Sequence, residues 1–210
     1  MPRIQAPTVA EHRARQREAI LDAARALLAE NGESPSLAAA GARAGLARSS
    51  VYEYFSSRDD LLAAVVADVL PAWAGRIVDA VNAAPTPGER VWAYVTANVE
   101  LFAGSEQAVA RALTNVVDPA VLAAPMAEFH QSLRKPLLAA LRSHGERQPE
   151  VMADIIGSMV VRASRDLWSQ NKRTARRRLD TALALLRRVL GSYLQLPPDG
   201  DSARSPVARD

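Results

Sequence analysis

The sequence predicts an all-α protein of about nine helices, on the basis of three observations. Alanine, leucine and arginine, which favour helices, are plentiful along the 210 residues. Apolar residues recur at intervals of three and four in most segments, which is the spacing of one helix face. Alternating runs of β-branched and aromatic residues, which are typical of strands, are missing.

Composition excludes several classes of protein. Hydrophobic residues make up 49% of the chain and charged residues 23%, as in a soluble globular protein. Because there is no cysteine, disulfides and thiolate chemistry are excluded, and a cytoplasmic location is expected. The N-terminus lacks the apolar region of a secretory signal, and no run approaches the roughly 20 apolar residues of a membrane span. We therefore expect no membrane partner.

The charge balance permits a nucleic-acid partner but does not require one. The net charge is +3 at pH 7. Residues 1–60 hold eight arginines and eight acidic residues, so their charges cancel. A DNA-binding face in this part of the chain must therefore come from the placement of its cations.

The chain begins with a segment that has no periodicity and continues as a helix. Residues 1–10 hold two prolines and predict a flexible arm. Over residues 11–31 apolar residues follow the i, i+4, i+7, i+8 spacing of a helix with one buried face. Asn31 and Gly32 are residues that end helices.

A helix-turn-helix is expected next. Ser36 is a candidate N-cap for a short helix over residues 37–43. Gly45 can adopt the left-handed backbone of a tight turn without steric cost. A helix over residues 48–54 then completes a candidate DNA-binding domain over residues 11–57.

A second helical domain is predicted over residues 58–196, followed by a disordered tail over residues 197–210. The tail is polar and rich in proline. Residues 57–60, Ser-Arg-Asp-Asp, resemble a capping box with acids in the first turn. Pro71 should kink the helix that follows. The expected helices cover residues 58–82, 88–103, 106–116, 119–144, 149–170 and 174–195.

The predicted helix over residues 48–54 has two chemically different faces. Val51 and Phe55 share an apolar side that can pack on the first helix. The other side presents Arg48, Ser49, Ser50, Tyr52, Glu53 and Tyr54. Hydroxyls and arginine donate to phosphates and base edges, and Arg58 could contact the DNA backbone from the next helix. A helical hairpin with a merely solvated polar face is the structural alternative.

Glu53 is the unexpected residue on this face, because a carboxylate repels phosphate. One interpretation is that it accepts a hydrogen bond from the amino group of a cytosine. Another is that it pairs with an arginine such as Arg48 and orients it. A third is that it is a repulsive bystander.

Residues 17–66 hold a set of positions with a familiar order and spacing. These positions are Ile20-Leu21, Ala24, Leu27-Leu28, Gly32, Ala44-Gly45-Leu46, Ser50-Val51-Tyr52, Tyr54-Phe55 and Ser57-Arg58-Asp59-x-Leu61. In this arrangement the segment, about a quarter of the chain, resembles the N-terminal domain of the tetracycline-repressor (TetR) family of transcriptional regulators. The resemblance implies that residues 48–54 form the recognition helix, with Ser50, Tyr52 and Tyr54 mostly on phosphates. Arg58 takes the position of the usual lysine.

Several positions depart from the family pattern. Ala47 replaces the usual serine, so the recognition helix loses a side-chain cap worth about 1 kcal/mol. Ala40 and Gly41 replace an Ile-Ala pair, which predicts thinner packing of the second helix. Ala38 offers no side chain for a base contact, and Ser49 replaces a common glycine.

The resemblance also implies a regulatory domain that binds a small-molecule effector and a homodimer built mainly from the last two helices. The chain would then be a ligand-responsive regulator, by family default a repressor, that is released by its effector from a near-palindromic double-stranded DNA operator. The expected dimer residues are Ile155, Met159, Arg162, Leu183, Leu186 and Leu190. The apolar stripes of the two helices support this interface, and ordinary core packing is the alternative.

Candidate ligand-pocket residues are polar or aromatic side chains set in apolar helix faces. They are Trp73, Trp92, Asn98, Phe102, Met126 and His130. For each of them, core packing is an alternative explanation. An apolar or amphipathic ligand is expected, because such pockets are mostly apolar.

Other functions have less support in the sequence. No glycine-rich phosphate loop, HExxH or GxSxG motif is present, and the three histidines lack metal-ligand spacing, so we expect no enzyme, cofactor or metal site. The basic run over residues 172–178 is interpreted as a solvated helix start, with a second nucleic-acid patch as the alternative. A helical adaptor is the rival function, but it gives no reason for Ser50, Tyr52, Tyr54 and Arg58 to share an exposed face.

Overall fold

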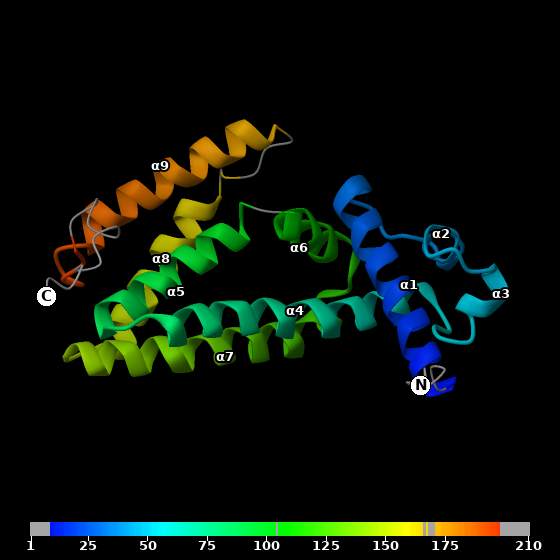
Figure 1. The fold of residues 1–210 in the computed structure, drawn as a ribbon, viewed down its shortest axis with the longest axis horizontal. Helices are drawn as coiled ribbons and strands as arrows, with labels where there is room; N and C mark the ends of the chain where they lie inside the picture. Colours follow the sequence, from blue (N-terminus) through cyan, green and yellow to red (C-terminus); the bar gives the residue numbers. More distant parts are fainter. Residues whose placement is uncertain (1–8, 104, 166, 168–170, 198–210) are drawn as a thin grey trace, which may run out of the picture. The chain divides into compact units, whose positions relative to one another are not determined.

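The computed structural model describes residues 9–103, 105–165, 167 and 171–197. Within these ranges the chain forms nine helices and no strand (Figure 1), so the expected all-α class is confirmed. Most of the predicted arm, residues 1–8, and most of the predicted tail, residues 198–210, lie outside the described residues.

The chain forms two compact units, each built from segments far apart in the sequence. Of the described residues, the first unit contains 9–74 and 105–131, and the second contains 75–103, 132–165, 167 and 171–197. The division falls inside two long helices, α4 (Arg58–Ala83) and α7 (Pro119–His144). A functional boundary after residue 57 stays a prediction.

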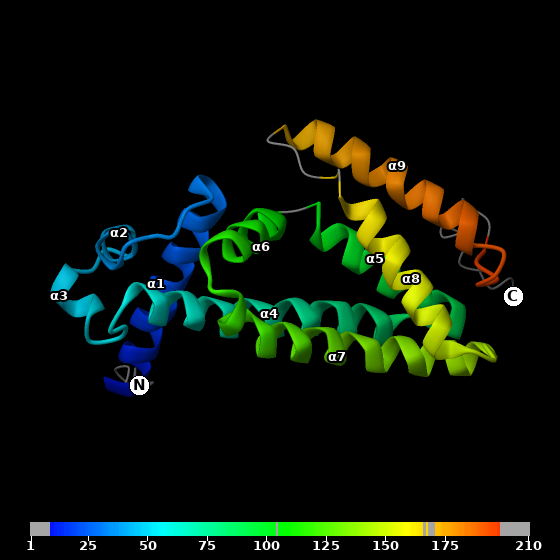
Figure 2. The ribbon, with the colours of Figure 1, turned by 180° about the vertical axis from the view of Figure 1, so that it is seen from behind.

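The first unit is organised around α1 (Val9–Asn31). This helix packs against α2 (Leu37–Arg43) and α6 (Ser105–Val116), which lie on either side of it in Figures 1 and 2. The predicted apolar face of α1 is buried, with Ile20, Ala24 and Leu28 fully inaccessible to solvent. α3 (Arg48–Val51) contacts α2, which completes the helix-turn-helix.

The first unit also buries the apolar residues at the start of α4. By length and composition alone, α4 is the one helix of the described residues that could cross a membrane. Half of its apolar window is buried inside the protein, including Leu61, Val65 and Val66. Helix α4 runs continuously through Pro71.

The second unit is a helical core centred on α5 (Pro87–Leu101). Its valines at 91, 95 and 99 are completely buried, and the helix contacts both α8 (Pro149–Ser164) and α9 (Lys172–Leu190). Leu137 and Leu141 of α7 join the same core. α5 begins with a capping box, in which Thr86 and Glu89 bond to each other's backbone N–H groups.

Three predicted helices differ from the structure by more than two residues at one end. α8 ends at Ser164 instead of residue 170. Asn171 caps the next helix by accepting hydrogen bonds from the backbone N–H groups of Arg173 and Thr174. α9 therefore begins at Lys172, and it ends at Leu190 instead of residue 195. α3 ends at Val51 and continues as a turn over residues 52–54.

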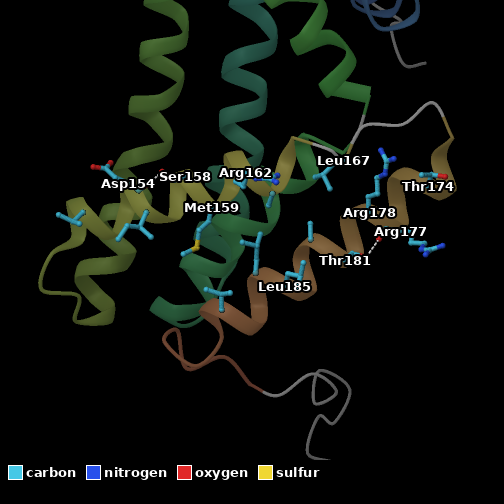
Figure 3. Close-up of a pocket in the computed structure, with 16 residues that line it drawn as sticks. Asp154, Ser158, Met159, Arg162, Leu167, Thr174, Arg177, Arg178, Thr181 and Leu185 are labelled. Atoms are coloured by element: carbon cyan, nitrogen blue, oxygen red, sulfur yellow. Dashed lines mark hydrogen bonds between the residues drawn. The ribbon is translucent and has the colours of Figure 1, made fainter.

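A groove with a volume of about 1370 Å³ lies between α8 and α9 in the second unit. Figure 3 shows its lining residues projecting from the two helices. One set of lining residues is apolar and exposed, and it consists of Val151, Ile155, Leu185 and Val189. A second set is basic, and it consists of Arg162, Arg177 and Arg178. The groove is therefore amphipathic.

Gly88 should be essential to the second unit, because α5 approaches the turn after α9 closely at this residue. A Cβ at residue 88 would lie 2.0 Å from the backbone oxygen of Leu194. We expect Gly88→Ala to lower the free energy of unfolding by about 2 kcal/mol, measured by urea denaturation.

Gly75→Ala is the matched control. Gly75 lies in α4, and apart from the adjacent backbone of its own helix a Cβ there would meet no heavy atom within 4 Å. This substitution should stabilise the chain by up to about 1 kcal/mol, since alanine has the higher helix propensity. Equal effects of the two substitutions would contradict the close approach at Gly88.

Candidate nucleic-acid interface

The helix-turn-helix is set by local features that the sequence predicts. The Ser36 hydroxyl accepts a hydrogen bond from the backbone N–H of Ala39 at 3.0 Å and so caps α2. Gly45 has a φ of +71°, the left-handed turn conformation. Both expectations are confirmed.

Gly41 brings α2 and α3 close together. It is buried, and a Cβ at this position would lie 2.4 Å from Cγ2 of Val51. The side chain of Val51 is itself fully buried, so it occupies the space that a larger residue at position 41 would need. The sequence predicted thinner packing of α2 at this position. The structure shows that α2 and α3 approach each other closely here, which only glycine permits.

Residues 48–55, here named the recognition segment, are helical over a shorter stretch than expected. Ala47 provides no side-chain cap, as predicted, and the α-helix covers only Arg48–Val51. The next residues continue as a turn, in which the N–H of Glu53 donates to Ser50 O at 3.2 Å and that of Tyr54 donates to Val51 O at 3.0 Å. The residues of this turn therefore extend the polar face that begins in α3.

The apolar and the polar side of this segment differ in burial, as predicted. Val51 and Phe55 are buried, with exposed fractions of 0% and 2%. Arg48, Ser49, Tyr52 and Glu53 are exposed, whereas Ser50 and Tyr54 are half-buried. An exposed basic and hydroxyl-bearing surface therefore covers this end of the first unit.

Arg48 and Tyr52 lie together on the exposed side. An Arg48 Nη2 donates to the Tyr52 hydroxyl at 3.4 Å, and its guanidinium carbon lies 5.8 Å from the ring centroid. The hydrogen bond to Tyr52 raises the pKa of Arg48, so the guanidinium stays protonated. Because the hydroxyl accepts this bond, its own proton remains available to a phosphate oxygen.

Arg58 supplies a second cation at the start of α4. The predicted side-chain cap at Ser57 is confirmed, because Ser57 Oγ accepts from the N–H of Asp60 at 3.1 Å. Asp60 Oδ2 accepts from the N–H of Ser56 at 2.8 Å and not from that of Ser57, so the reciprocal capping box is incomplete. The Arg58 side chain is 61% exposed. The cap fixes the backbone of Arg58, and its guanidinium is mostly in solvent, with Nε 3.9 Å from Asp59 Oδ1.

Glu53 and Tyr54 are placed differently from one another. The side chain of Glu53 is exposed, and its backbone oxygen accepts a hydrogen bond from Arg13 at 3.2 Å. The hydrogen bond of Arg48 goes to Tyr52, which leaves the pairing of Arg48 with Glu53 without support. The Tyr54 hydroxyl donates to Gln16 Oε1 at 2.6 Å, so Tyr54 is tied to α1.

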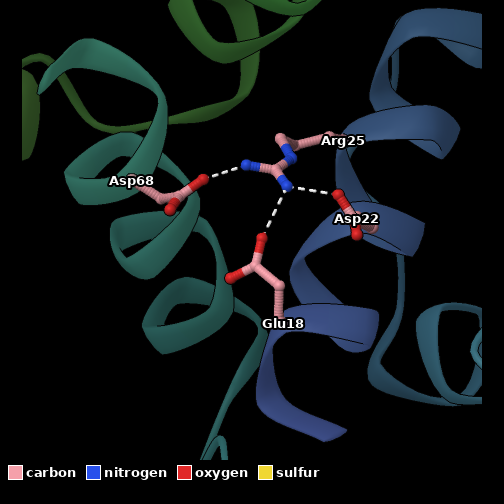
Figure 4. A network of polar contacts seen from close by, with 4 residues as sticks. All are labelled: Glu18, Asp22, Arg25 and Asp68. Atoms are coloured by element: carbon pink, nitrogen blue, oxygen red, sulfur yellow. Dashed lines mark hydrogen bonds and ion pairs between the residues drawn. The ribbon is translucent and has the colours of Figure 1, made fainter. Parts of the chain in front are cut away.

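Arg25 anchors α1 to α4 within the first unit (Figure 4). Its guanidinium pairs with Glu18 and Asp22 of α1 and with Asp68 of α4. The Arg25 side chain is only 25% exposed. Helix α1, which contacts the recognition segment, is therefore also held to α4 by an ion pair.

The predicted dimer residues fall into two groups. Ile155, Met159 and Arg162 of α8 line the groove described above. Of the α9 residues, Leu186 lines the groove but is 93% buried, Leu190 lies in the core of the second unit, and Leu183 packs against that core. On the same helix, which contacts α5, Leu185 and Val189 are exposed. The set of dimer residues stays a prediction.

The predicted pocket residues are divided between the units. Trp73, Met126 and His130 belong to the first unit, and Trp92, Asn98 and Phe102 belong to the second. His130 is exposed, so it is not embedded in an apolar face. Asn98 is buried and donates to Tyr94 O at 2.8 Å. The pocket stays a prediction.

The segment that contains the helix-turn-helix matches a known protein family. Residues 20–65 match the family model of bacterial regulatory proteins of the tetR family. No match was found among curated proteins.

Solved structures share the fold. A TetR/AcrR family regulator from Thermobifida fusca is 19% identical, with a TM-score of 0.64 over 82% of this chain and 96% of its own. SmeT, solved with triclosan, is 20% identical, with a TM-score of 0.62 over 93% and 100%. FadR from Bacillus subtilis, solved with stearoyl-CoA, is 16% identical, with a TM-score of 0.58 over 80% and 97%.

Proposed function

Because residues 20–65 match the family model of bacterial regulatory proteins of the tetR family, we propose that the chain represses transcription by binding a near-palindromic operator as a homodimer. A small-molecule effector releases it from the DNA. This function explains the helix-turn-helix, the exposed apolar face of the second unit and the absence of catalytic motifs with one mechanism.

The observation that carries the proposal is the exposed face at the end of the first unit. Arg48 and Arg58 supply cations, while Ser49 and Tyr52 supply hydroxyls. These groups are donors to phosphate and to base edges, and each is presented by backbone that a cap, a turn or the core fixes. An adaptor that does not bind DNA has no use for this arrangement.

The dimer is supported by the open side of the second unit. Single exposed apolar residues are ordinary, but neighbouring ones in a groove are typical of an interface. Ile155, Leu185 and Val189 are 42%, 53% and 61% exposed. A second copy meets the same face in a symmetric interface, which repeats the recognition segment on DNA at a fixed spacing.

The chemical class of the effector is apolar or amphipathic. The two structural neighbours SmeT and FadR were solved with triclosan and stearoyl-CoA, both of which carry large apolar parts. The second unit has a core dominated by valine and leucine, which are the apolar residue types that line such sites.

Selection from a pool of random DNA duplexes tests the proposal without knowledge of the operator. Repeated capture by the purified chain, followed by sequencing, should enrich a motif with two-fold symmetry. Half-sites should lie about one helical turn of DNA apart or somewhat more. If the captured pool stays random at low salt, sequence-specific DNA binding is ruled out and the adaptor function is favoured.

A further inference from the structure

The N-terminal part of α1, residues 9–19, precedes the segment that matches the family model. Most of its side chains are exposed, so burial does not explain its presence. Arg13, Gln16 and Arg17 are spaced i, i+3, i+4 and share one face of the helix. All three contact the end of the recognition segment.

These contacts fall on consecutive residues. An Arg13 Nη2 donates to the backbone oxygen of Glu53 at 3.2 Å, and its guanidinium carbon lies 5.4 Å from the Tyr54 ring centroid. The Tyr54 hydroxyl donates to Gln16 Oε1 at 2.6 Å. The Arg17 guanidinium carbon lies 5.6 Å from the centroid of Phe55. We call Arg13, Gln16 and Arg17 the α1 clamp.

The recognition segment needs such support because its helix is short. After Val51 the backbone is held by single turn hydrogen bonds, and the carbonyl groups near the end of a helix have no partner within it. Arg13 supplies one of the missing partners. The exposed residues Tyr52 and Glu53 therefore lie between a core anchor at Val51 and the α1 clamp.

We propose that Gln16 and Arg13 are positioning residues for DNA recognition and that Tyr54 acts through Gln16 instead of contacting a phosphate. A tyrosine hydroxyl has one proton, and here Gln16 accepts it. Phosphate oxygens only accept hydrogen bonds, so Tyr54 has no donor left for them while this bond is made. The inference rests on the proposed DNA-binding function.

A double-mutant cycle on the selected duplex separates the two roles of Tyr54. Tyr54→Phe and Gln16→Leu each remove the hydrogen bond without changing charge. Each should weaken binding about fivefold, as expected for one hydrogen bond. If Tyr54 acts through Gln16, the double variant should be no weaker than either single variant. Multiplied losses would show a direct DNA contact and overturn the inference.

Binding to random duplex provides a second readout. Positioning residues affect the specific complex, so the ratio of specific to non-specific affinity should fall in both single variants while non-specific affinity stays unchanged. Arg15→Ala is the matched control, since Arg15 is an exposed residue of the same helix outside the α1 clamp. It should leave the ratio unchanged, and an equal loss in Arg15→Ala would also overturn the inference.

Amide hydrogen exchange in the free protein tests the α1 clamp independently of DNA. Exchange at residues 52–55 should accelerate in Gln16→Leu and remain at the wild-type rate in Arg15→Ala. Unchanged exchange in Gln16→Leu would show that the contact positions nothing. A failed selection would instead count against the proposed function, so the two failures are distinguishable.

Discussion

Leu185→Glu should convert the proposed homodimer to a monomer and abolish tight operator binding. Leu185 lies on α9 and is 53% exposed, so the single chain has room for the new side chain. In the proposed dimer the carboxylate would be buried without a partner, which costs several kcal/mol. Because a dimer contacts both half-sites, affinity for the selected duplex should fall by at least about 100-fold.

Sedimentation velocity and a mobility-shift titration measure these two effects. Val121→Glu is the control, because Val121 is similarly exposed, at 47%, but lies on α7 in the first unit. This variant should remain dimeric and bind DNA as the wild type does. A Leu185→Glu protein that stays dimeric would show that the interface lies elsewhere on the chain.

Gly41→Ala should destabilise the helix-turn-helix by about 2 kcal/mol and displace the recognition segment. The added Cβ would lie 2.4 Å from Cγ2 of Val51, which is fully buried and has no room to move away. Thermal unfolding measures the loss. Binding to the selected duplex should weaken in parallel, because Val51 anchors the helix that carries Arg48.

A second substitution tests whether the collision with Val51 is the cause. Val51→Ala removes the colliding methyl group and by itself costs about 2 kcal/mol as a cavity. In the Gly41→Ala, Val51→Ala double variant the two changes compensate, so the total loss should be smaller than the sum by at least about 1 kcal/mol. Strict additivity would rule out the collision.

Local features of this fold could be predicted from the sequence. The Ser36 cap, the Gly45 turn and the hydroxyl cap at Ser57 depend on residues within a few positions of one another, and all are present. The burial of Val51 and Phe55 follows from helical spacing in the same way.

Contacts between distant segments could not be predicted. Gln16 and Tyr54 are 38 residues apart, and only the packing of α1 brings them together, although the spacing of Arg13, Gln16 and Arg17 could have suggested a shared face. On α9, Leu190 and Val189 are both apolar, and contact with α5 decides which of them faces inward. The sequence could not show which of the candidate residues line a pocket, because neither spacing nor composition distinguishes a core residue from a pocket residue.

The central claim, that the face of the recognition segment binds DNA, is tested most directly by titrating the selected duplex with Arg48→Ala and Arg173→Ala over a range of salt concentrations. Both arginines are exposed in the first turn of a helix, but only Arg48 belongs to the proposed interface. Arg48→Ala should weaken binding at least about tenfold and, for a phosphate contact in each subunit, reduce the salt dependence of log K by about 2. Arg173→Ala should match the wild type. If Arg48→Ala binds as tightly as the wild type at every salt concentration, or if Arg173→Ala shows the larger loss, the assigned DNA-binding face is wrong.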